Sequence, residues 1–108
     1  MDEQKVESVS LEDAYRETKK GNFKQAIDIY DILLSNNPDD QDVLINKSIT
    51  LMNMKNYEDS LKSIEFISYE SPHGFDKMLI EASCFYNLGK IEKAQDLYVK
   101  ITNRIPLN

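Results

Sequence analysis

Three prolines, Pro38, Pro72 and Pro106, are spaced 34 residues apart in this chain, and the residues between them repeat with the same spacing. The clearest columns are a turn column of Gly21, Lys55 and Gly89, and two columns of small residues, Ala14, Ser48 and Ala82, and Ala26, Ser60 and Ala94. A fixed period of this length is typical of stacked repeat proteins, in which each unit buries its apolar face against its neighbours. The 108 residues therefore hold three units, about the minimum for a stable stack.

Composition narrows the classes of partner. Hydrophobic residues make up 41% and charged residues 30%, as in an ordinary folded domain. The net charge of −6 and the lack of a Lys/Arg cluster argue against nucleic-acid binding. No apolar run approaches the ~20 residues that span a bilayer. The chain starts without a basic and apolar leader and has one cysteine, so we expect a cytoplasmic protein without an internal disulfide.

Apolar spacing predicts two helices in each unit and an all-α fold. The expected helices span residues 11–20, 23–36, 41–53, 57–69, 76–88 and 91–103, after a polar tail at 1–9 that we expect to be frayed or disordered. Ser10 with Asp13, Asn22 with Gln25, and Asn56 with Asp59 have the spacing of capping boxes. Gly21 and Gly89 suit left-handed turns after a helix, where Lys55 should be less favourable. The prolines are expected to stop each second helix.

The repeat resembles a known family. Residues 21–38, Gly-Asn-Phe-Lys-Gln-Ala-Ile-Asp-Ile-Tyr-Asp-Ile-Leu-Leu-Ser-Asn-Asn-Pro, and residues 89–94 with Tyr98, Ile101 and Pro106, are similar to the second half of a tetratricopeptide repeat. The resemblance covers about residues 7–108 and implies a right-handed superhelical stack of three helix-turn-helix units, at about 7–40, 41–74 and 75–108. The common tryptophan near the start of the first helix is replaced by Ser10, Leu44 and Met78.

In this family the first helix of each unit lines a concave groove that binds peptides. The matching positions are apolar or aromatic at Leu11, Tyr15, Ile45, Ile49, Met52, Leu79, Ile80 and Tyr86, and charged at Glu12, Lys19, Asp42 and Asp76. We expect a peptide or helix of a partner protein, apolar to mildly basic, to contact Leu11, Tyr15, Ile45, Asn46, Ile49, Met52, Leu79 and Tyr86. Tyr15, Ile49, Met52 and Tyr86 are the expected anchors. The alternative interpretation is that part of this stripe is core, or is covered by a segment outside the chain.

The resemblance also separates possible partners. Family members that hold a chaperone's C-terminal carboxylate use a basic clamp, but at the matching places this chain has Leu11, Tyr15, Asn46, Asp76 and Ile80. Only Asn46 fits, and Asp76 has the wrong sign, so we expect no such tail. Residues 82–94 are also similar to the last aligned repeat in the N-terminal region of the signal recognition particle's larger tetratricopeptide subunit, through Ala82, Cys84, Tyr86, Leu88, Ile91, Glu92 and Ala94. An assembly subunit of such a ribonucleoprotein is therefore the alternative function.

Catalytic chemistry has few candidate residues. A Cys–His or Ser–His pair would have to use His73, which lies in an expected loop, while Cys84 lies inside an expected helix. No cluster has metal-ligand spacing and no glycine-rich phosphate loop is present, so we expect neither an enzyme nor a cofactor or metal. Leu97, Tyr98, Ile101 and Ile105 are expected to leave an apolar face on the last helix. That face predicts either a longer protein or a homodimer through the C-terminal helix.

Overall fold

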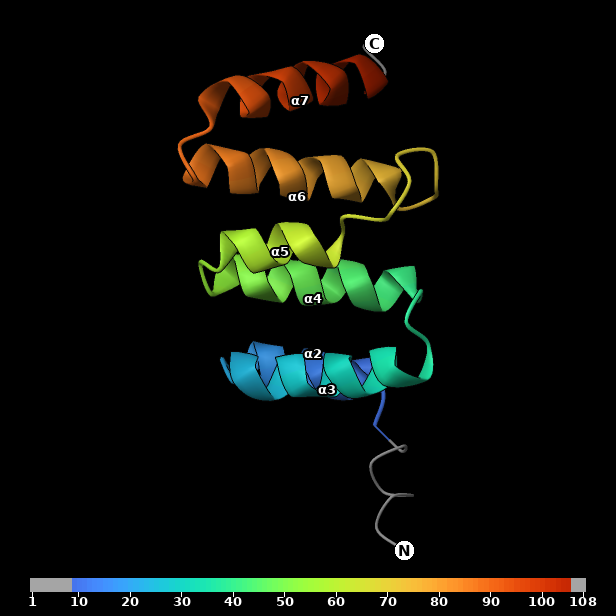
Figure 1. The fold of residues 1–108 in the computed structure, drawn as a ribbon. Helices are drawn as coiled ribbons and strands as arrows, with labels where there is room; N and C mark the ends of the chain where they lie inside the picture. Colours follow the sequence, from blue (N-terminus) through green and yellow to red (C-terminus); the bar gives the residue numbers. More distant parts are fainter. Residues whose placement is uncertain (1–8, 106–108) are drawn as a thin grey trace, which may run out of the picture.

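The computed structural model describes residues 9–105, which form six α-helices and no β-strand (Figure 1). The helices are α2 (Leu11–Lys19), α3 (Phe23–Asn36), α4 (Gln41–Asn53), α5 (Tyr57–Ser63), α6 (Gly74–Asn87) and α7 (Ile91–Arg104). They are layered from the α2–α3 pair at one end to α7 at the other, with α3 against α4 and α4 and α5 against α6. The all-α prediction is confirmed, and the tail expected at residues 1–9 lies outside the described residues except for Val9.

The turn between the two helices of each unit is the same structure three times. Gly21, Lys55 and Gly89 have φ angles of 82°, 65° and 81°. In each turn this residue's N–H donates to the carbonyl three residues earlier, and the next N–H donates to the carbonyl five residues earlier, at 2.8–3.0 Å. This is the Schellman arrangement, which satisfies the free carbonyls at a helix end and requires a left-handed residue. The prediction for Gly21 and Gly89 is confirmed, and Lys55 adopts the same conformation with a side chain.

The small-residue columns lie where the helices of each unit meet. All six residues are at most 1% exposed: Ala14, Ser48, Ala82, Ala26, Ser60 and Ala94. In the middle unit, where serines replace alanines, Ser48 Oγ donates to the Ser60 carbonyl at 2.9 Å and Ser60 Oγ donates to the Ser48 carbonyl at 2.8 Å. Side chains of this size allow the two backbones to approach closely. The 34-residue period in the sequence thus corresponds to a period in helix packing.

Three apolar clusters hold the layers together. The first is centred on Ala14, Ala26, Tyr30 and Val43, and therefore joins the first unit to α4. The second contains Ile45, Ile64, Ile67, Ile80 and Cys84 and joins the second unit to α6. The third contains Met78, Ala82, Leu97 and Ile101, between α6 and α7.

The third cluster corrects the expectation of an apolar face on the last helix. Leu97 and Ile101 are only 7% and 6% exposed because they pack against α6. Tyr98 and Ile105, the other two members of the expected face, are exposed. Only two of the four expected residues therefore remain exposed for a homodimer contact through this helix.

The largest error in the predicted helices concerns α5, which was expected to continue to residue 69 but ends at Ser63. Beyond it, the amides of Ile64, Glu65 and Ile67 donate to carbonyls three residues earlier, so the chain tightens into turns. The Lys77 ammonium of α6 donates to the carbonyls of Glu65 at 3.1 Å and Ile67 at 2.6 Å. These bonds from another helix satisfy carbonyls that the unwinding leaves free. Pro72 therefore does not stop this helix.

The remaining helix ends follow the sequence closely. Pro38 follows the end of α3, α6 begins two residues earlier than expected, and Pro106 lies outside the described residues. Ser10 and Asp13 form the predicted capping box, and Asp40 accepts from the Val43 amide. The capping boxes predicted at Asn22 and Asn56 are wrong, because neither side chain makes a cap hydrogen bond.

Candidate functional site

Two helices of different units enclose a shallow apolar pocket, here called the α4–α6 pocket. Ile49 and Met52 of α4 and Asp76, Leu79 and Ile80 of α6 line it, around a volume of about 210 Å³. All five are positions where the sequence predicted a groove. The pocket exists because α4 and α6 pack directly on each other, which places their corresponding turns side by side.

The α4–α6 pocket exposes apolar side chains that the fold leaves without cover. Ile49 is 36% and Leu79 42% exposed, whereas Ile80 is 4% exposed and forms part of the core behind them. Met52 is half-buried and packs against the same core cluster. Two adjacent helices thus expose large aliphatic side chains above an apolar core. An apolar side chain of a partner could pack between them and cover this surface.

The rim of the α4–α6 pocket is acidic. Asp76 lines the pocket and lies beside His73, whose Nδ1 is 3.8 Å from Asp76 Oδ2. His73 Nε2 lies 3.1 Å from Asp42 Oδ1 on the first turn of α4. The imidazole therefore lies half-buried between carboxylates of two helices, while His73 itself lies in the expected loop, just before α6 begins. A cationic partner group would meet favourable charge here.

The other predicted groove residues are distributed differently. Ile45 is a correction: it is only 5% exposed and belongs to the core cluster, because its position on α4 faces α5 and α6.

Leu11 is half-buried against the first core cluster. Asn46 Nδ2 donates to the Asp42 carbonyl of its own helix at 2.7 Å. Tyr15 and Tyr86 are exposed but do not line the pocket. The core interpretation thus holds for Ile45 and Ile80.

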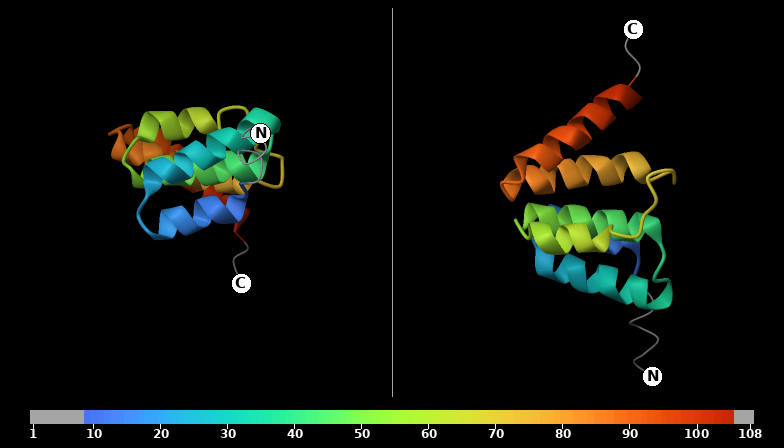
Figure 2. Two further views of the ribbon diagram at one scale, coloured as in Figure 1. Left: turned by 90° about the horizontal axis from the view of Figure 1, so that it is seen from below. Right: turned by 45° about the horizontal axis from the view of Figure 1, so that its top comes forward.

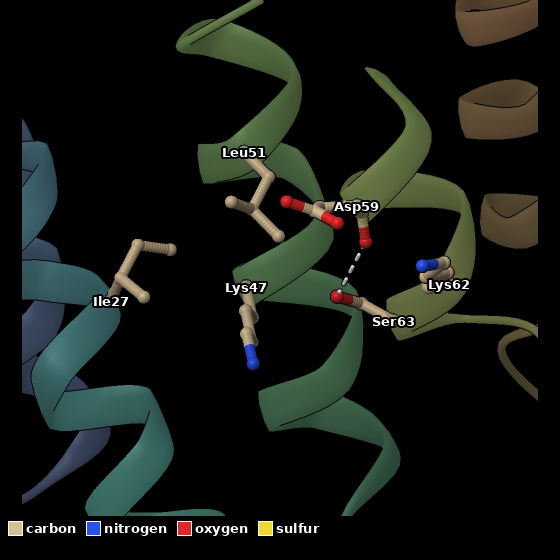
Figure 3. Close-up of a pocket in the computed structure, with 6 residues that line it drawn as sticks. All are labelled: Ile27, Lys47, Leu51, Asp59, Lys62 and Ser63. Atoms are coloured by element: carbon tan, nitrogen blue, oxygen red, sulfur yellow. Dashed lines mark hydrogen bonds between the residues drawn. The ribbon is translucent and has the colours of Figure 1, made fainter. Parts of the chain in front are cut away.

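A second hollow, between α3, α4 and α5, is more polar (Figure 3). Ile27, Lys47, Leu51, Asp59, Lys62 and Ser63 line it. Lys47 Nζ is 2.7 Å from Asp31 Oδ1, and Ser63 Oγ donates to the Asp59 carbonyl of its own helix at 3.0 Å. These groups are engaged within the chain, so the hollow offers less to a ligand than the α4–α6 pocket.

The two side chains that could react, the Cys84 thiol and the Tyr69 hydroxyl, lie in environments that disfavour their ionised forms. Cys84 is fully buried, and burial raises the pKa of its thiol, so the reactive thiolate is disfavoured. Burial, with the hydrogen bond to Glu81, raises the pKa of Tyr69 to about 12. Within residues 9–105, no group of three or more His, Cys, Asp or Glu residues could hold a metal ion. None of the helices described in this chain is long and apolar enough to cross a membrane.

Comparison of the chain with protein-family models, with curated proteins and with solved structures gives no match.

Proposed function

We propose that this chain is a three-unit stack of the tetratricopeptide type that binds an apolar, mildly basic peptide or helix of a partner protein. The repeated Schellman turns and the buried small-residue columns support the repeat. The observation that carries the binding function is the α4–α6 pocket, where Ile49, Met52 and Leu79 leave apolar surface around a floor formed by Ile80.

Binding by such a surface is an equilibrium event without chemistry. An apolar side chain of the partner enters between Ile49 and Leu79, and a cationic group of the partner meets Asp76 on the acidic rim. Interface energy concentrates in a few large side chains that lose their water on binding. Half-buried Met52 adds an adaptable wall, because its unbranched side chain can fit ligands of different shapes.

A companion subunit of a ribonucleoprotein would be one partner of this kind. Of the residues that carry that resemblance, Ala82, Cys84 and Ala94 are buried packing residues. They therefore support a shared way of packing helices rather than a shared contact surface.

The proposal is tested by capturing proteins from a native lysate of the source organism with the wild-type chain and with an Ile49→Arg variant. The arginine places a bulky charge in the pocket, at a side chain already 36% exposed, so helicity should be unchanged in circular dichroism. The matched control is Phe66→Arg, which changes a side chain that is 91% exposed outside the pocket.

Specific proteins retained by the wild type and by Phe66→Arg, and lost with folded Ile49→Arg, would support the α4–α6 pocket as the binding surface. Equal retention by all three chains, or by none, would contradict it.

A further inference from the structure

A larger apolar pocket lies at the far end of the molecule from α2, between α6, α7 and the segment that precedes α6. Its lining, which defines the α7 pocket, consists of Tyr69, Met78, Leu97, Lys100, Asn103 and Arg104 around about 350 Å³. Met78 and Leu97 are 4% and 7% exposed and form its apolar floor. Figure 2 shows how α7 diverges from α6 toward the C-terminal end of α7.

Two side-chain contacts and a close backbone approach hold the wall made by Tyr69 in place. Tyr69 Oη donates to Glu81 Oε1 at 2.6 Å, and the Lys77 ammonium lies 4.5 Å from the centre of its ring. The chain also approaches α6 closely here, since a Cβ on Gly74 would lie 1.8 Å from the Tyr69 carbonyl oxygen. The pocket is therefore formed before any ligand arrives, which lowers the ordering cost of binding.

The rim of the α7 pocket is cationic. Lys100, Asn103 and Arg104 follow one another at helical spacing on one face of α7, and the lining residues include no carboxylate. Neither Lys100 nor Arg104 forms an ion pair with a carboxylate of residues 9–105, since no such oxygen lies within 4.0 Å of their side-chain nitrogens. The Arg104 guanidinium instead lies 5.8 Å from the centre of the Phe75 ring. This local charge is opposite to the net charge of −6 and to the acidic rim of the α4–α6 pocket.

We propose that the α7 pocket is a second docking site, for an acidic peptide segment of a partner protein. One apolar side chain of that segment would enter between Tyr69, Met78 and Leu97. Carboxylates that flank it would meet Lys100 and Arg104, while Asn103 offers a hydrogen bond between them. The charge of the rim selects this partner, because a basic segment would place like charges together. The site is independent of the α4–α6 pocket and prefers the opposite charge.

The experiment selects displayed random peptides of about twelve residues on the immobilised wild-type chain. Enriched peptides are labelled, and their Kd is measured by fluorescence anisotropy against the wild type, the Lys100→Glu/Arg104→Glu variant and a Lys20→Glu/Lys24→Glu variant. The last variant changes the net charge equally at exposed lysines of the first unit. Two altered peptides are included, one with alanine for the apolar residue and one with lysines for the acidic residues.

We expect enriched peptides with a large apolar residue between Asp or Glu residues. Their binding should weaken at least about tenfold with Lys100→Glu/Arg104→Glu and with the alanine peptide, and little with Lys20→Glu/Lys24→Glu. The lysine peptide should bind the Lys100→Glu/Arg104→Glu variant more tightly than the wild type. The Ile49→Arg variant should bind the acidic peptide with the Kd of the wild type. A reversed charge preference in the variant requires a folded pocket, so it separates lost recognition from lost structure.

Three results would overturn the proposal. One is a selection that yields no acidic consensus. Another is an equal loss with Lys20→Glu/Lys24→Glu, which would show attraction by net charge alone. The third is that the wild type self-associates in sedimentation experiments while the Lys100→Glu/Arg104→Glu variant is monomeric. A second copy of the chain would then be the occupant of the α7 pocket.

Discussion

Replacing Lys55 by glycine should stabilise the protein, because Lys55 is the one residue with a side chain that adopts a left-handed φ within residues 9–105. Its φ is 65°, and its turn has the same two hydrogen bonds as those at Gly21 and Gly89. A left-handed residue with a Cβ costs about 1–2 kcal/mol. Glycine also makes the unfolded chain more flexible, which costs about 0.4–1 kcal/mol. The midpoints of these two ranges differ by about 0.8 kcal/mol, which is the expected rise in the free energy of unfolding for Lys55→Gly.

The assay is urea unfolding followed by circular dichroism, with the slope checked for constancy. The reverse change, Gly89→Lys, should lower stability by a similar amount, because nothing lies within 4 Å of a Cβ at Gly89 and only the backbone is strained. Lys55→Ala is the matched control, since it removes the long side chain but retains the Cβ. If Lys55→Gly and Lys55→Ala change stability equally, the left-handed strain is not the cause and the reasoning is refuted.

Three further predictions concern the middle unit and its junction with α6. Gly74→Ala should destabilise the fold and change the near-ultraviolet signal of Tyr69, because the new Cβ would overlap the Tyr69 carbonyl; an unchanged melting temperature would contradict this. Ser48→Ala or Ser60→Ala alone should cost about 1 kcal/mol in urea unfolding, whereas the double change should cost less than the sum, since alanines occupy these positions in the other units. Because the pKa of Tyr69 is raised to about 12, its contribution to stability is complete below the unfolded value of 10.0 and is lost as the pH rises toward 12. Tyr69→Phe should therefore lose less stability than the wild type between about pH 10 and about pH 12, and equal losses would count against the burial of Tyr69 and its hydrogen bond to Glu81.

The sequence predicted most helices because their signals are local. Helical spacing, the turn glycines and the Ser10–Asp13 capping box each act within a few residues. The caps at Asn22 and Asn56 failed because each residue also ends the preceding Schellman turn. Asn22 instead donates its side-chain amide to Glu17 Oε1 at 2.9 Å.

The early end of α5 could not be predicted from its own residues. The donor that satisfies its freed carbonyls is Lys77, which belongs to the next helix and lies at least ten positions along the chain. Local spacing at Ile64 and Ile67 suits a helix as well as it suits the buried turns that form there.

The candidate site could be predicted in part. Ile49, Met52 and Leu79 lie together as the repeat register requires, but one helical turn contains both exposed and buried apolar positions, so Ile45 could not be assigned. The α7 pocket gave no signal in the sequence, because its wall at Tyr69 exists only where α5 has unwound.

The most direct test of the binding function is to map where a captured partner's peptide contacts the chain, by amide chemical shifts of the labelled protein. When the protein is saturated with an apolar, mildly basic peptide of that partner, the amide signals of Ile49, Met52 and Leu79 should shift. The amide signals of Lys100 and Arg104 should remain unchanged. Shifts confined to α7, or to α3 and α5, would contradict the assignment of the α4–α6 pocket as the main binding surface.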